Sequence, residues 1–567
     1  MLLAGLCASA LMMGACKGGD KLPAEEISVD AASLELSSAD ENELSQHFVI
    51  SARSGSEAET LKVLSAADLD GATYEERMIE GSTVVYTDWT ASNDDASMRA
   101  DRVEMIGLNQ AEDGPTLDKL VLRGLSVKGY EGEADERVKT MDAEASSLVV
   151  VKPSPAMFAS LADIMMARDA SSDVAGETMD GLSGGEDFRA FHLEDMRATV
   201  TEEGKTGTLT LKQAIVGNDT DNEVMDLVLE TINFDWAPDQ DGDDKSIRVD
   251  LDGLTVMGLD VATINDAGLQ TLGATQGLMS GFIAGFAPTA TPPYRQIDLG
   301  KVDVASAMFD LKTDGFEADS DVKGDVTILR SVFSPLVLTL KDMSGTPVAP
   351  YMDVLRENGF AEISFKGSST TTFDRKNDRV SFADNGSEID EGLRMKCTYS
   401  ILGLMAAEAA LKASGVTPPV LDMSEDGNQD TAFEDYMNQS QAYAAAQAEA
   451  NESIKLEGMN CDIQDVPGNS LVERGYKVAS DVTGKPVAVL KGGATTMIAL
   501  SSLTAQSEFQ RDLMDTLGSG LIDFIDTPGQ TMTIKMSPDE PVGLMSLAGE
   551  DGAEPNIKPL NLTVEVR

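Results

Sequence analysis

Side chains that could do chemistry are few in this sequence and widely spaced. Asp239, Asp241 and Asp243 stand at alternate positions, the spacing at which a calcium loop presents its first carboxylates. The run then departs from such a loop, because Asp244 occupies the sixth position, where the sharp turn needs glycine, and Asp250 at the twelfth already fits a strand. The run therefore predicts a solvated hairpin turn, with weak Ca²⁺ binding as the alternative.

The residue types used in hydrolases and zinc sites do not form a recognisable constellation. His47 and His192 are the only histidines, and neither has a cysteine near it at zinc-ligand spacing. Residues 181–185 match G-x-S-x-G, but polar residues precede them where a buried strand should lead into the turn. The sequence therefore predicts a glycine-rich loop there, no enzymatic activity and no bound cofactor. A hydrolase that uses two of the 97 acidic residues stays open, since spacing alone cannot select the pair.

The amino-terminal residues carry the strongest signal in the chain. An uncharged run from Leu2 to Met13 leads into a Met-Gly-Ala-Cys motif that ends at Cys16. This motif resembles the lipobox of bacterial lipoproteins. The resemblance implies a signal peptide over 1–15, a lipid on Cys16 and a tether to the cell envelope. In such lipoproteins an aspartate directly after the modified cysteine favours retention in the inner membrane. This chain has Lys17 at that position, so the resemblance implies the outer membrane, with the protein facing the periplasm or the surface. A short buried apolar segment with an incidental cysteine is the alternative.

Besides Cys7 and Cys16 at the amino terminus, the chain has two cysteines, Cys397 and Cys461. Export would place this pair in an oxidising compartment. An even pair in such a compartment predicts a disulfide. The alternative is two isolated reduced thiols.

Charge excludes one class of partner. The chain has 97 acidic and 43 basic residues and a net charge of −54. Such a surface repels phosphate backbones, so we expect no nucleic-acid binding. The acidity can serve solubility, or Ca²⁺ or Mg²⁺ can bridge the carboxylates. No uninterrupted apolar run long enough to span a membrane follows the signal, so the lipid would be the main membrane anchor.

Strand signals dominate the body of the chain. Apolar and polar residues alternate in many segments, which is typical of antiparallel sheet with one wet face. Turn signals at 203–204, 217–219 and 385–386 separate candidate strands. The clearest alternating segments are 120–127, 208–211, 247–251, 297–299, 302–304, 532–536 and 562–566.

Helices interrupt this pattern about five times. Ser154-Pro155 predicts the start of a helix over 155–168, and a capping box at Thr431 predicts one over 432–457. Further helices are expected at 350–357, 400–413 and 503–525. The predicted fold class is α+β, with curved antiparallel sheets in several divergent strand-plus-helix modules and an elongated body.

These signals divide the chain into consecutive segments. After the signal peptide at 1–15 and a polar tether at 16–40, three β-rich modules are predicted, then a helical insertion closed by the disulfide, then a strand-helix-strand module. Their predicted bounds are 41–170, 171–295, 296–396, 397–461 and 462–567.

One stretch, from Ala267 to Tyr294, carries no charged residue. Within it glycine recurs every fourth residue, which on a helix makes a smooth groove along one side. Such a groove predicts close approach of another backbone. Packing on the protein's own sheet, insertion into lipid and contact with a partner all stay open. The glycines are Gly273, Gly277, Gly281 and Gly285.

Taken together, these patterns predict a lipid-anchored, non-enzymatic envelope protein that binds a lipid or another apolar ligand or serves as an assembly surface. The series of strands with helices between them resembles large periplasmic proteins of the AsmA and YdgA kind, which implies a role in envelope lipid homeostasis. A Ca²⁺-dependent adhesion scaffold and a carboxylate-based envelope hydrolase are the alternatives. Protein partners and oligomeric state stay undetermined.

Overall fold

The computed structural model describes every residue from 44 to 567 except a set of internal segments and single positions. These are 52, 54, 68, 70, 94, 112–113, 132–137, 168–187, 203–204, 220–223, 238–245, 261–291, 293, 345, 417–428, 505–507 and 544–557. The fold is α+β with antiparallel strand pairing, as the alternating segments predict. The described residues form two compact units, an N-terminal unit up to Ala307 and a C-terminal unit from Met308 onward.

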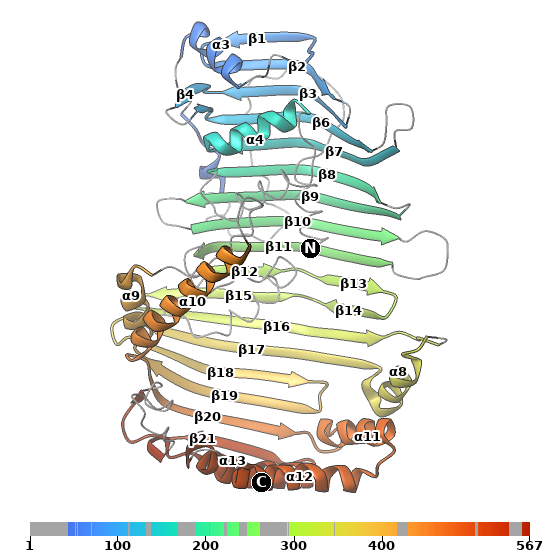
Figure 1. The fold of residues 1–567 in the computed structure, drawn as a ribbon, viewed down its shortest axis with the longest axis vertical. Coiled ribbons are helices and arrows are strands. Elements are labelled where there is room, and N and C mark those ends of the chain that lie inside the picture. The colour runs from blue at the N-terminus through green and yellow to red at the C-terminus, as the bar shows by residue number, and fades with distance from the viewer. Residues whose placement is uncertain are drawn as a thin grey trace. The chain divides into compact units, whose positions relative to one another are not determined.

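The N-terminal unit is a meander in which long strands pair antiparallel with their chain neighbours (Figure 1). Two short strands then pair with successive stretches of the last long one. A separate two-stranded hairpin, β4 (Asn109–Ala111) with β5 (Gly114–Thr116), lies within the same unit. The main strands are β1 (Glu76–Glu80), β2 (Thr83–Ser92), β3 (Ala96–Ile106), β6 (Lys119–Glu131), β7 (Val138–Val151), β8 (Ala190–Glu202), β9 (Lys205–Asp219), β10 (Val224–Ala237), β11 (Ile247–Asp260), β12 (Gln296–Leu299) and β13 (Val302–Ser306).

Both faces of this sheet carry a buried cluster, the second of them over β6 to β11. Helices α3 (Glu57–Ala66) and α4 (Pro155–Met165) supply residues to one large core cluster. Alternate residues of the same strands, such as Val121 and Val149, join a second cluster on the other face. Leu44 and Phe48, which precede the sheet, close that second cluster.

Local signals explain where the two helices begin. Ser56 accepts a hydrogen bond from the Glu59 backbone while Glu59 reaches back to it, a complete capping box for α3. Ser154 caps α4 and Pro155 fills its first position, as the sequence predicts.

In the C-terminal unit, too, each long strand pairs antiparallel with the next (Figure 1). Strands β14 and β15 pair with successive stretches of β16. Strands β21 and β22 both pair with β20, and β23 pairs with β21. The strands are β14 (Phe309–Thr313), β15 (Phe316–Lys323), β16 (Val326–Leu340), β17 (Glu362–Asp374), β18 (Arg379–Ile389), β19 (Leu393–Leu402), β20 (Lys455–Asp465), β21 (Thr531–Met536), β22 (Val542–Gly543) and β23 (Thr563–Val566).

Helices of the C-terminal unit gather at the strand ends and beside β23. A π-helical turn (Arg356–Phe360) continues the first helix, and a short 3-10 turn (Lys558–Leu560) precedes β23. The helices are α8 (Ala349–Leu355), α9 (Leu404–Ser414), α10 (Gln429–Asn451), α11 (Leu471–Thr483), α12 (Val487–Thr504) and α13 (Glu508–Asp526).

Several predicted boundaries are wrong. Residues 217–219 and 385–386 are not turns: the first lie at the end of β9, and the second lie inside β18, beside a register shift. Residues 400–402 belong to β19, so the helix predicted from 400 begins at Leu404. The helix predicted to reach 457 ends at Asn451, because β20 begins at Lys455. Helix α11 and most of α12 are not predicted at all.

Candidate functional site

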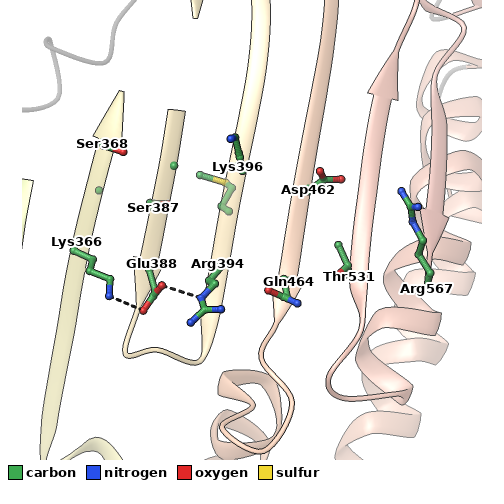
Figure 2. Close-up of a pocket in the computed structure, with 13 residues that line it drawn as sticks. Lys366, Ser368, Ser387, Glu388, Arg394, Lys396, Asp462, Gln464, Thr531 and Arg567 are labelled. Atoms are coloured by element: carbon green, nitrogen blue, oxygen red, sulfur yellow. Dashed lines mark hydrogen bonds and ion pairs between the residues drawn. The ribbon is translucent and has the colours of Figure 1, made fainter. Parts of the chain in front are cut away.

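A hollow of about 870 Å³ lies on the sheet of the C-terminal unit, and we call it the trough. It crosses six neighbouring strands, from β17 through β18, β19, β20 and β21 to β23 (Figure 2). Its lining residues are Lys366, Gly367, Ser368, Gly386, Ser387, Glu388, Arg394, Met395, Lys396, Asp462, Gln464, Thr531 and Arg567.

Strand register aligns the polar lining residues across the sheet. Lys366 pairs with Glu388, and Glu388 pairs with Arg394. Arg394 in turn stands opposite Gln464, which stands opposite Thr531. The backbone of Thr531 exchanges two hydrogen bonds with Arg567, at 2.8 and 3.1 Å. Residues that are far apart in the chain therefore form one line perpendicular to the strands. A second line begins where Lys396 faces Asp462.

Helix α13 shows which face of the sheet carries the trough. It approaches β23 so closely that a Cβ added to Gly520 would lie 2.3 Å from Val564 Cγ1. The side chain of Val564 therefore points toward α13. Because side chains alternate along a strand, Glu565 and Arg567 lie on the opposite face, and Arg567 lines the trough there.

Small residues form the floor at the β17–β18 side. Gly367, Ser368, Gly386 and Ser387 line this part of the trough and leave room above the backbone. A Cβ added to Gly367 would lie 3.1 Å from the Gly386 carbonyl oxygen, tighter than ordinary contact. Register shifts occur on both sides of this region, one of them between Phe382 and Asn385. These irregularities bend strands locally.

Glu388 joins two cations at this end of the trough. Lys366 Nζ lies 2.9 Å from Glu388 Oε1, and Arg394 Nε lies 2.8 Å from Glu388 Oε2 (Figure 2). Burial of the carboxyl opposes its ionisation, but the bonds from Lys366 and Arg394 outweigh burial and hold the pKa of Glu388 below its usual value. The side chains of Lys366 and Arg394 are 45% and 52% exposed, so both cations also face solvent.

The middle of the trough is neutral or acidic. Asp462 Oδ1 accepts a hydrogen bond of 2.6 Å from Thr533 Oγ1, and Arg567 Nη2 lies 3.5 Å from the same hydroxyl. Overall the lining holds four basic and two acidic side chains. In a chain with 97 acidic and 43 basic residues, this excess of positive charge sets the trough apart.

Arg474 of α11 fixes the hairpin that carries Glu388 and Arg394. Its guanidinium forms an ion pair with Asp390, donates to the Asn358 carbonyl oxygen at 3.2 Å and lies 4.3 Å over the Phe360 ring. The hairpin is thus held against both α11 and the turn after α8, which limits the movement of its two charged side chains.

Cys397 and Cys461 form a disulfide between β19 and β20, where they stand directly opposite each other. Each cysteine adjoins a trough residue, Lys396 or Asp462. The cysteines lie inside strands, so they do not mark the edges of the helical insertion. The insertion between the strands holds α9 and α10, and its first helix begins at Leu404.

The two histidines lie in the N-terminal unit. His47 Nε2 is 3.5 Å from Asp226 Oδ2, and Asp226 Oδ1 accepts a 2.6 Å hydrogen bond from the Gly258 backbone. His192 is 4% exposed, and its Nε2 lies 2.9 Å from Gln213 Nε2. Burial, together with the charge of Lys119, lowers the pKa of His192 to about 4. His47 and Asp226 help to fix the segment before the sheet.

Several predicted sites lie outside the described residues. Over the part of the chain that is described, no group of three or more potential metal ligands converges. The predictions that lie outside it are Cys16 with the signal and tether, the loop at 181–185, the aspartates Asp239, Asp241 and Asp243, and the glycines Gly273, Gly277, Gly281 and Gly285.

None of the trough residues is singled out by sequence analysis. The one usable signal is the cysteine pair. Had the two cysteines been assigned to facing strands, their register would have placed Lys396 opposite Asp462 and Arg394 opposite Gln464.

Comparison with known proteins covers only part of the chain. A protein-family model described as an uncharacterized protein matches residues 398–567, which include Asp462, Gln464, Thr531 and Arg567 but not the cations on β17 and β19. A search of curated proteins finds no match. Among the described helices, none is both long and apolar enough to cross a membrane. The chain is therefore similar over its C-terminal 170 residues to a family without an assigned activity.

Proposed function

We propose that this protein binds an anionic molecule in the trough and is held at the cell envelope by a lipid on Cys16. One observation carries the binding proposal: four basic side chains line a single hollow in a chain of net charge −54. Exposed Lys and Arg side chains attract and hydrogen-bond carboxylates or phosphates. The lining thus has more basic than acidic side chains, whereas acidic residues outnumber basic ones in the chain as a whole.

Binding without catalysis fits the trough better than hydrolysis. A general acid at neutral pH needs a raised pKa. The ion pairs of Glu388 lower its pKa instead, so it is ionised. Among the described carboxyl groups with a shifted pKa, every shift is downward. These shifts give no support to the carboxylate hydrolase.

The ligand group that enters the trough should be polar. Met395 is the one large apolar side chain among the described lining residues, and glycine, hydroxyl, amide and charged residues form the remainder. The trough thus favours an anionic group over the wholly apolar ligand that the sequence pattern suggests. An amphipathic lipid with an anionic headgroup would fit both the polar trough and the apolar ligand that the sequence pattern predicts.

Two features of the chain support the envelope location. The lipobox-like motif at Cys16 predicts export, and a disulfide such as Cys397–Cys461 is stable in an oxidising compartment. Replacing Cys16 by serine should release the protein from membranes. Continued fractionation with membranes would contradict the lipid anchor.

Calorimetric titration of the purified full chain with inorganic phosphate tests the binding proposal. Arg394→Gln removes one cation from the trough, and we expect it to weaken phosphate binding at least tenfold. Arg375→Gln is the matched control, because Arg375 is exposed in the β17–β18 connection and does not line the trough. Absence of phosphate binding to the unaltered protein, or equal loss in both variants, would overturn the proposal.

A further inference from the structure

We infer that the ligand of the trough is a short linear saccharide chain with an acidic group at one end. This inference rests on the proposed function and adds the class of ligand. It is carried by the shape of the trough and by the uneven distribution of charge along it.

The trough is long and narrow. Its lining spans six strands, and neighbouring strands lie about 4.8 Å apart, so it extends for about 24 Å across the sheet. On β17, β18 and β19 the lining covers three residues, such as 366–368 or 394–396, which corresponds to about 7 Å along the strand, and on the β21 side it narrows to Thr531 and Arg567. A linear molecule lying across the strands would occupy this shape, whereas a compact anion would fill only one end.

Charge is concentrated at one end of the trough. Lys366, Arg394 and Lys396 all lie on β17 and β19; the first two flank the carboxylate of Glu388, and Lys396 stands opposite Asp462. Arg567, on the other side, is three strands from Arg394, about 14 Å away. One acidic group of the ligand would therefore be placed at the β17–β19 end.

The middle of the trough selects hydroxyl groups over further anions. Asp462 accepts a hydrogen bond on Oδ1, and its second oxygen has further acceptor capacity. Gln464 and Thr531 beside it can both donate and accept. A carboxylate at this place repels a second acidic group but accepts from hydroxyls. A peptide with several acidic side chains would be repelled there, whereas the hydroxyls of a sugar chain would be bound.

Three probes separate the contributions of the two ends. Maltotetraonate carries one carboxylate at the end of a linear saccharide, gluconate is the acidic end alone, and maltotetraose is a neutral chain. Calorimetry on the full chain should show maltotetraonate binding at least tenfold tighter than either of the others. Gluconate and phosphate should bind with similar, weaker affinities.

Variants identify where each part binds. Gln464→Leu and Thr531→Val should each weaken maltotetraonate about fivefold and leave gluconate within twofold, because each removes hydrogen bonds from the middle only. Arg394→Gln should weaken both acids. Arg375→Gln should change neither.

The outcomes distinguish this inference from the proposed function. If gluconate and maltotetraonate bind equally, anion binding stands and the saccharide inference is overturned. If tetraglutamate binds more tightly than maltotetraonate, an acidic peptide is the ligand and the inference is also overturned. If neither phosphate nor any of the acids binds, the proposed function fails. If maltotetraose binds as tightly as maltotetraonate, the acidic group contributes nothing to saccharide binding and the inference is overturned, while phosphate binding still decides the proposed function.

Discussion

The two units use the same antiparallel architecture but bury it differently. The largest fully buried side chains among the described residues, including Trp89, Phe158 and Phe188, all belong to the N-terminal unit. Strand β20 of the C-terminal unit has nine consecutive half-buried residues, from Leu456 to Gln464. A sheet with buried clusters on both faces mainly provides stability, whereas a face left open can bind a ligand. Under the proposed function, stability and recognition are divided between the units.

The largest expected effect is at Trp89. Its ring is fully buried, packs 4.8 Å from Tyr86 and donates a 3.0 Å hydrogen bond to the Met165 carbonyl oxygen. Trp89→Ala should lower the free energy of unfolding of the N-terminal unit by about 3–5 kcal/mol. Urea unfolding followed by Trp236 fluorescence measures it. Val332→Ala, at a position 53% exposed in the C-terminal unit, should cost less than about 0.5 kcal/mol, as measured by hydrogen exchange in β16. Equal effects would refute the contrast in burial.

Removal of the disulfide should affect the C-terminal unit alone. Cys397 and Cys461 are separated by 64 positions, and opening a loop of that size should lower stability by about 4 kcal/mol. In the Cys397→Ser/Cys461→Ser variant, hydrogen exchange should accelerate in β19 and β20. The urea midpoint of the tryptophan fluorescence transition, which reports Trp89 and Trp236 of the N-terminal unit, should not change. A parallel shift of that transition would show that the units do not unfold independently.

Acid should weaken the N-terminal unit through His192. Its pKa falls from 6.5 to about 4 on folding, so below pH 6.5 the unfolded chain takes up a proton that the folded chain does not. Stability is therefore complete above pH 6.5, falls as the pH drops, and reaches its full loss near pH 4. Between pH 7 and pH 5 the expected loss is about 2 kcal/mol. His192→Leu should remove that part of the pH dependence, and an unchanged slope would count against it.

The smallest expected effect concerns the charge of the trough. Glu388→Gln removes one of two carboxylates from the lining and frees Lys366 and Arg394 for a ligand. Phosphate affinity should rise about three- to tenfold, because a competing negative charge is lost. Calorimetry compares this variant with the unaltered protein. Weaker binding would mean that Glu388 mainly positions the two cations.

Short-range signals predicted the elements, and register determined the site. Alternation over 247–251 and 532–536 correctly predicted β11 and β21, and Ser154-Pro155 correctly predicted the start of α4. The turn predicted at Asn385-Gly386 was wrong, because the pair lies beside a register shift inside β18 and not at a hairpin. Strand pairing overrides turn propensity when neighbours are available on both sides.

The trough itself could not be found from local patterns. Lys366, Glu388, Arg394 and Arg567 are scattered over about 200 residues and line one hollow only because their strands pair side by side. Each of these residues alone reads as an exposed charge on a wet strand face. Long-range pairing information was needed, and the cysteine pair offered the only piece of it in the sequence.

The central claim is that the open sheet of the C-terminal unit binds anions while the N-terminal unit does not. Hydrogen exchange of the full chain, measured by mass spectrometry with and without saturating phosphate, tests it most directly. We expect slower exchange in β17, β18 and β19 and unchanged exchange in β2 through β8. Protection confined to the N-terminal unit, or no protection in β17 through β19, would contradict the account.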